Sequence, residues 1–194
     1  MRKIIREAIE AGIELRRACL ESLDEPLLKA AETMVTCLKG GGKILVCGNG
    51  GSAADAQHFA GELVNRFEMN RPGLAAVAMT HDASVITSIA NDFSFDDIFS
   101  RQVEALGREG DLLLAISTSG DSVNVIKAAD AAQLIGMKTV ALTGRDGGLL
   151  GKHSNVAVHL NIAHRSTPRV QEMHITSLHI ICSLVDELMF GQGS

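Results

Sequence analysis

The sequence predicts an α/β protein in which a mostly parallel, doubly wound (flavodoxin-like) sheet is covered by helices on both faces, giving three layers. Short apolar runs of strand length alternate with stretches of helical periodicity along most of the chain, and this alternation is typical of parallel sheets. Polar loops follow several of the apolar runs, at the strand ends where such sheets bind their ligands. A chain of 194 residues with 46% hydrophobic content can bury one full core, so we expect residues 1–194 to form a single domain.

The spacing of apolar residues in the segment 1–40, which precedes the sheet, predicts a pair of amphipathic helices. Ile5, Ile9 and Ile13 recur at helical spacing in the first helix, and the segment Asp24-Glu25-Pro26 suits the cap and first turn of a second helix. The apolar faces of both helices need a partner, and the same helices of sister chains would provide one. We therefore expect a homo-oligomer.

Residues 43–194 carry the alternating pattern of the α/β core. The expected strands cover residues 44–47, 75–79, 112–116, 139–142 and 156–160. The expected helices begin at Ser52, Ala83, Ser122 and Pro168, and the last of them is long. Polar loops follow the first four strands, at residues 48–52, 80–82, 117–122 and 143–148.

The charge and the lengths of the apolar runs favour a cytoplasmic protein. The formal net charge is −5 and the Lys and Arg residues are mostly scattered, which speaks against direct nucleic-acid binding. The apolar runs are far shorter than a membrane span, and the N-terminus lacks the apolar region of a signal peptide. Four cysteines stand singly among apolar neighbours, so we expect reduced and buried thiols at Cys19, Cys37, Cys47 and Cys182.

The first loop of the core, Gly48-Asn49-Gly50-Gly51-Ser52, has the composition of an anion-binding turn. It joins a buried strand to a helix, so the backbone N–H groups and the dipole of that helix favour a phosphate or sugar hydroxyls in the loop. The spacing Gly48-x-Gly50-x-x-Ala53 also satisfies a loose dinucleotide pattern. The acidic residue which that pattern requires lies too far along the chain, so we predict no nucleotide cofactor.

The loop of residues 117–122 is the second strong signal. Four hydroxyls and a glycine stand between an apolar strand and a helix, which makes a phosphate cradle that needs no lysine. The alternative is that these residues only cap the helix and complete the turn. We favour phosphate, because one cap does not require so many hydroxyls. The P-loop sequence Gly-Lys-Ser/Thr does not occur, which argues against a nucleoside triphosphate.

Two further groups of side chains combine reactive chemistry with helical spacing. His58 and Glu62 lie at i and i+4 and so share one helix face. Gln171, Ile175 and His179 form one stripe of the last helix, near its start. Each group also has a simpler explanation, since an i, i+4 pair is commonly a surface interaction and a lone histidine is commonly a hydrogen-bonded core residue.

Together these motifs resemble the sugar isomerase (SIS) domain and, within that family, the bacterial phosphoheptose isomerases. The resemblance covers nearly the whole chain and rests on the two loops above, on Ala90-Asn91-Asp92, on residues 142–148 and on Gln171-Glu172-Met173-His174. It implies an aldose–ketose isomerase that converts sedoheptulose 7-phosphate to D-glycero-D-manno-heptose 7-phosphate for lipopolysaccharide heptose synthesis. It also implies a tetramer with sites at subunit boundaries and, as in several such enzymes, bound zinc.

The resemblance also assigns roles to residues. The phosphate would be held by Ser117, Thr118, Ser119 and Ser122. The rest of the sugar would be contacted by Asn49, Gly50, Gly51, Ser52, Glu62, Asn91, Asp92 and Gln171. The catalytic acid and base would be Glu62 and His179, and the zinc ligands His58, Glu62, Gln171 and His179. Asp121 departs from the family, where an uncharged Asn is frequent, and its carboxylate would repel phosphate unless it turned outward.

The chemistry of isomerisation gives these roles a physical reason. One carboxylate can move a proton between adjacent carbons through an enediol, which suits Glu62, and an imidazole can shuttle protons on the oxygens, which suits His179. Zinc would polarise the carbonyl. A non-catalytic SIS protein that binds the bacterial replication initiator is the alternative, but those relatives lack the carboxylate and histidine that this chain keeps. The polar segment 163–167 is consistent with either a mobile cover or a connector.

Overall fold

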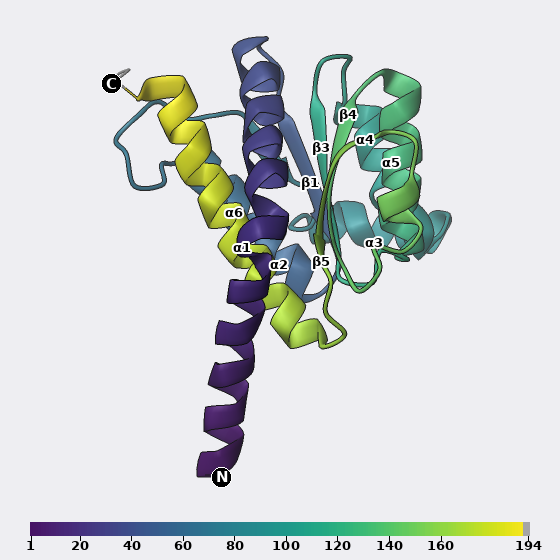
Figure 1. The fold of residues 1–194 in the computed structure, drawn as a ribbon. Coiled ribbons are helices and arrows are strands. Elements are labelled where there is room, and N and C mark those ends of the chain that lie inside the picture. Colours follow the sequence, from purple (N-terminus) through teal and green to yellow (C-terminus); the bar gives the residue numbers. More distant parts are fainter. Residues whose placement is uncertain (192–194) are drawn as a thin grey trace.

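The computed structural model describes residues 1–191 and confirms the predicted sheet (Figure 1). Its five strands are β1 (Ile44–Gly48), β2 (Ala76–Ala78), β3 (Leu112–Ser117), β4 (Lys138–Gly144) and β5 (Val156–Ile162). They lie in the order β2-β1-β3-β4-β5, and every pairing is parallel. The chain therefore winds outward in both directions from β1 and β3, and all the loops predicted to bind ligand leave the same edge of the sheet.

The helices cover both faces of this sheet, as expected. They are α1 (Arg2–Lys39), α2 (Gly51–Val64), α3 (Ala83–Asp92), α4 (Ser100–Leu106), α5 (Val123–Ile135) and α6 (Thr167–Phe190). One core layer joins α1, α2 and α6 to the sheet side chains Ile44, Val46 and Leu114. The other joins α4 and α5 to Leu45 and Cys47, with α3 packed at its margin. Neither α4 nor the short 3-10 turns at Phe95–Asp97 and Leu150–Lys152 was predicted from the sequence.

The predicted N-terminal pair of helices is wrong, because α1 is one helix of 38 residues that continues through Pro26. Proline removes one helical hydrogen bond and costs roughly 3 kcal/mol. The buried stripe nevertheless runs on without a change of phase through Leu15, Cys19, Leu23 and Leu27. Packing of this stripe against α6 on both sides of the proline offsets that local cost.

The first half of α1 projects beyond the rest of the molecule (Figure 1). Its predicted apolar face is uncovered in the single chain, where Ile5 and Ile9 are each 59% exposed and Ile13 is 44% exposed. An apolar stripe of this length in solvent is typical of a surface that another chain covers.

The last helix, α6, is long and apolar enough to cross a membrane if judged by length and composition alone. Its packing gives another reason for that composition, because Val170, Ile181, Cys182 and Val185 are buried against the sheet and the neighbouring helices. The four cysteines are free thiols, as predicted. Three of them are buried and Cys37 is half-buried.

Candidate active site

The turn between β1 and α2 has the geometry expected of an anion-binding loop. Gly50 adopts a φ of 57°, which strongly favours glycine, and α2 begins at the next residue. A side chain at Gly51 would come within 2.3 Å of Nε2 of Gln171. Glycine is therefore required at position 51 so that Gln171, on the first turns of α6, can lie against the start of α2.

The Asn49 side chain is held by a partner that the sequence analysis missed. Its Nδ2 donates to Oδ1 of Asn124 at 2.8 Å, and Nδ2 of Asn124 donates back to Oδ1 of Asn49 at 2.9 Å. Asn124 is buried and lies in the first turn of α5. This reciprocal amide pair fixes the β1–α2 loop to the β3–α5 loop. No local pattern signals the contact, because 75 residues separate the two amides.

Three serine side chains converge at the start of α5, and we call Ser117, Ser119 and Ser122 the hydroxyl cradle. Oγ of Ser117 lies 2.9 Å from Oγ of Ser122 and 3.4 Å from Oγ of Ser119. Ser122 is the N-cap residue of α5, yet its side chain makes no capping hydrogen bond. The hydroxyls therefore gather in front of a helix N-terminus, where the dipole and free N–H groups favour a phosphate. The structure thus shows no helix cap at Ser122, but Ser117 and Ser119 do complete the turn, since their Oγ atoms accept from the backbone N–H groups of Gly120 and Asp121, each at 3.1 Å.

The loop of residues 144–149 forms a wall beside the cradle. The backbone N–H of Leu150 donates to the Gly120 carbonyl at 2.8 Å, and a side chain at Gly120 would collide with the Gly147 carbonyl. Asp121 is also part of this contact, since its Oδ1 accepts from the backbone N–H of Leu149 at 3.0 Å. The carboxylate is thus turned toward this loop.

A second group lies on the outer surface of α2 and α6, and we call His58, Glu62 and His179 the carboxylate–imidazole cluster. Nε2 of His58 lies 3.0 Å from Oε1 of Glu62 and 3.4 Å from Nε2 of His179. The Phe67 ring stacks on His179 with ring centroids 5.5 Å apart. The structure thus joins the predicted His58–Glu62 pair to His179 of the predicted stripe, on neighbouring helices.

Asp55 lies one turn before His58 and was not predicted as a site residue. Burial raises its pKa to about 6, and the neighbouring His58 offsets part of that effect. Its Oδ2 is buried without a hydrogen-bond partner among the described residues. A buried carboxyl group with a raised pKa beside reactive side chains is a common feature of functional sites.

Within one chain, the hydroxyl cradle and the carboxylate–imidazole cluster lie apart. Glu62 follows the start of α2 by eleven residues, which is about 16 Å of helix axis. The cradle begins α5, which covers the opposite face of the sheet. Gln171 lies at the loop edge against Gly51, about 12 Å of helix axis from His179. Asn91 and Asp92 end α3, where Asn91 donates to Asp92 at 2.8 Å, and both are exposed.

Comparison with known proteins agrees with this architecture. The chain belongs to the SIS domain family, whose model matches residues 9–144. A phosphoheptose isomerase of Shewanella sediminis is 53% identical over 189 residues, which cover 97% of this chain and 96% of that protein. Two solved structures are similar over nearly their whole length. Phosphoheptose isomerase GmhA from Neisseria gonorrhoeae has a TM-score of 0.90 and 47% identity, with coverage of 96% of this chain and 98% of that one. A phosphoheptose isomerase from Francisella tularensis has a TM-score of 0.91 and 41% identity, with coverage of 95% and 97%.

Proposed function

We propose that the chain is an aldose–ketose isomerase that converts sedoheptulose 7-phosphate to D-glycero-D-manno-heptose 7-phosphate. The observation that carries this proposal is that one chain holds both a hydroxyl cradle at a helix N-terminus and a clustered carboxylate and imidazole. The first suits a sugar phosphate, and the second suits proton transfer next to a carbonyl. The similarity to phosphoheptose isomerases over 97% of the chain supports the same substrate class.

In this reaction Glu62 acts as the base. Its carboxylate removes a proton from the carbon beside the carbonyl, and the resulting enediol receives the proton back on the neighbouring carbon. His179 moves protons on the sugar oxygens, because an imidazole can donate and accept near neutral pH. Phe67 stacks on one face of the His179 ring and limits its rotation.

The complete site contains residues of more than one chain. Within one chain, the axial distance along α2 and the opposite placement of α5 keep Glu62 away from the cradle. In sedoheptulose 7-phosphate the carbonyl is five carbon–carbon bonds from the carbon that bears the phosphate, which is a shorter span than the stretch of α2 from its start to Glu62. We infer that the carboxylate–imidazole cluster of one chain serves the cradle of another, in a homotetramer whose contacts cover the exposed stripe of α1.

The carboxylate–imidazole cluster also suits zinc. A tetrahedral zinc with bonds of about 2.0–2.1 Å holds its ligand atoms roughly 3.4 Å apart, close to the separation of the two imidazole nitrogens of His58 and His179. Residues 1–191 contain no ready-made group of three His, Cys, Asp or Glu side chains around a common point. His58, Glu62 and His179 would hold the ion, and Gln171 would have to come from a second chain. Bound zinc would polarise the substrate carbonyl, and it would compete for the lone pairs with which Glu62 and His179 accept protons.

A cytoplasmic location is part of the same proposal, and the similarity to phosphoheptose isomerases supports it. Zinc binding is measurable without turnover, as metal content per chain after dialysis against a limiting zinc concentration. The wild-type protein should retain about one ion per chain, and His58→Ala should lose it. Equal zinc retention in the two proteins would contradict the ligand set.

The reaction is tested by NMR of sedoheptulose 7-phosphate with the intact protein. The wild-type protein should produce an aldoheptose 7-phosphate, and Glu62→Gln should not, because the amide cannot accept the proton. Turnover by Glu62→Gln at the wild-type rate would refute the assignment of the base. Absence of turnover by a correctly assembled wild-type protein would refute the isomerase itself.

Sharing of the site is tested by mixing two inactive variants. Glu62→Gln has an intact cradle, and the double variant Ser119→Ala, Ser122→Ala has an intact cluster. If the site spans two chains, mixed oligomers regain activity, because some pockets combine the two intact halves. Mixing without recovery, with mixed assembly confirmed by mass spectrometry, would show that each chain contains a complete site.

A further inference from the structure

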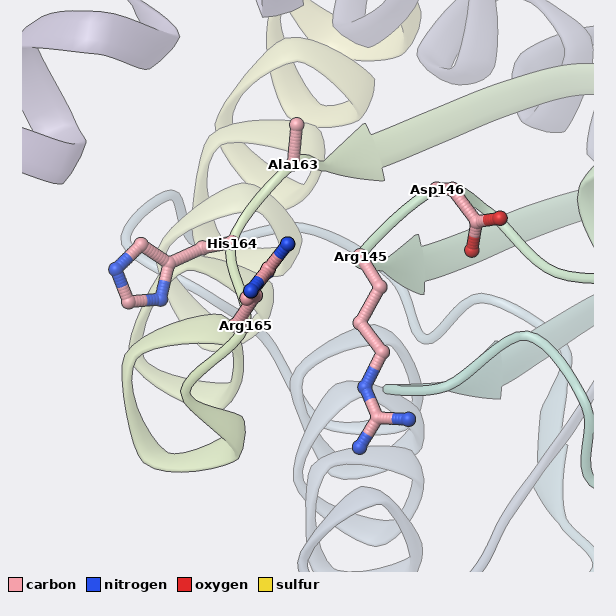
Figure 2. A pocket seen from close by; sticks show the side chains of 5 residues that line it. All are labelled: Arg145, Asp146, Ala163, His164 and Arg165. Carbon is pink, nitrogen blue, oxygen red and sulfur yellow. The ribbon is translucent and has the colours of Figure 1, made fainter.

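A basic hollow opens at the loop edge of the sheet, between the 144–149 loop and the segment after β5 (Figure 2). It measures about 690 Å³ and is lined by Arg145, Asp146, Ala163, His164 and Arg165. We call Arg145, His164 and Arg165 the arginine hollow. No residue assigned above to the isomerase reaction lines it.

The two guanidinium groups have no acidic partner within residues 1–191. The one carboxylate in the lining belongs to Asp146, whose Oδ1 accepts from the backbone N–H of Gly148 at 3.4 Å. Figure 2 shows the Arg145 side chain extending away from that carboxylate. Nδ1 of His164 accepts from the backbone N–H of Ser166 at 3.1 Å, which leaves its Nε2 free to donate. The hollow therefore offers donors and positive charge with little to balance them.

The backbone at Arg145 is held in an unfavourable conformation. Its φ of 56° makes it the single non-glycine residue with positive φ in the described part of the chain. Its N–H donates to the His164 carbonyl at 3.3 Å, and its own carbonyl accepts from Nδ2 of Asn161 at 3.2 Å. Three glycines stand nearby in the same loop, so the protein keeps an arginine where glycine would cost less. Strain of this kind concentrates at binding sites.

We propose that the arginine hollow is a second anion site, separate from the hydroxyl cradle, that binds the phosphate group of a small phosphorylated molecule. Two guanidinium groups and an imidazole N–H match the charge and the several acceptor oxygens of a phosphate dianion. The hollow is wide and open on one side, which leaves room for the organic part of such a molecule. The site does not depend on the isomerase activity.

Binding is tested with inorganic phosphate and methyl phosphate, followed by 31P NMR line broadening. The starting protein is the Ser119→Ala, Ser122→Ala variant, so that the cradle contributes little. It should still bind both probes, and adding Arg165→Gln or Arg145→Gly should weaken binding about tenfold, since each removes one charged donor. Lys138→Gln is the matched control, because it removes a positive charge at the opposite edge of the sheet and should leave binding unchanged.

The Arg145→Gly variant also separates binding from folding. Glycine accepts positive φ, so the thermal midpoint of this variant should equal or exceed that of the wild-type protein. Loss of phosphate binding with an undiminished midpoint is the expected result. Unchanged phosphate binding in both arginine variants would overturn the proposal, as would loss caused equally by Lys138→Gln. Binding of inorganic phosphate without methyl phosphate would overturn the assignment to a phosphorylated molecule.

Discussion

The buried Arg71 should be one of the most important single residues for both stability and the position of Glu62. Its Nε lies 2.7 Å from Oδ1 of Asp186 on α6, and the two side chains are 1% and 5% exposed. Its Nη1 donates to the Leu63 carbonyl at 2.7 Å, and its Nη2 donates to the Glu62 carbonyl at 2.9 Å. One guanidinium thus joins the C-terminal end of α2 to α6.

Replacing Arg71 with Met keeps much of the volume and removes all of these bonds. Asp186 would remain buried without its partner, and its Oδ2 already has no hydrogen bond among the described residues. Breaking a buried ion pair in this way costs about 3–5 kcal/mol. For a chain of this size, that loss corresponds to a fall in the thermal midpoint of roughly 6–20 °C.

The assay is thermal unfolding followed by circular dichroism at a fixed protein concentration, because assembly itself contributes to stability. Lys127→Gln is the control. Its ion pair with Asp97 has the same 2.7 Å length, but the side chains are 41% and 28% exposed, so the midpoint should hardly change. Turnover by Arg71→Met, measured well below its midpoint, should also fall because the backbone of Glu62 loses an anchor. Equal midpoints for the two variants would refute the reasoning.

Two further predictions concern the cradle and a buried histidine. Ser122→Ala should raise KM for the sugar phosphate about tenfold, which is the effect of losing one hydrogen bond to a charged group. The unfolding midpoint should stay unchanged, because Ser122 does not cap α5. A lower midpoint with normal KM would mean that the hydroxyl is structural. Burial lowers the pKa of His174 from 6.5 to about 4. Between these two pH values the unfolded chain therefore binds a proton at His174 that the folded chain does not bind. Stability should therefore fall by about 3 kcal/mol as the pH drops through the window. His174→Gln should remove this component from urea unfolding curves between pH 6.5 and 4, and parallel pH profiles for the two proteins would contradict it. Asp55, with its raised pKa, contributes the opposite slope in both proteins and cancels in the comparison.

The sheet and its ligand-binding edge could be predicted from the sequence because their signals are local. A fully buried strand such as Leu112–Ser117 is apolar up to its last residue, and that serine begins the hydroxyl-rich loop. The continuity of α1 could not be predicted in this way. Pro26 is a local stop signal, whereas the packing of α1 against α6 that overrides it depends on residues far away in the chain.

The site shows the same division between local and distant information. The i, i+4 spacing of His58 and Glu62 gives their shared face, but the contact of His58 with His179 joins residues that are 121 positions apart. The amide pair of Asn49 and Asn124 is likewise a contact between two loops that only the folded sheet brings together. Sequence patterns therefore identify the reactive residue types, and the order of the strands in the sheet determines which of these residues contact one another.

A second chain would account for two features that the single chain leaves unexplained, namely the distance of Glu62 from the cradle and the exposed apolar stripe of α1. The cradle lacks a nearby base because α2 carries Glu62 away from the loop edge, and α1 exposes Ile5 and Ile9 where a soluble monomer would place polar residues. A second chain packed on α1 would bury the apolar stripe, and its own carboxylate–imidazole cluster could then face the cradle. Burial of the stripe would supply the free energy of association. Assembly and catalysis would in this arrangement depend on the same contact, so a chain that folds alone would bind phosphate without isomerising the sugar.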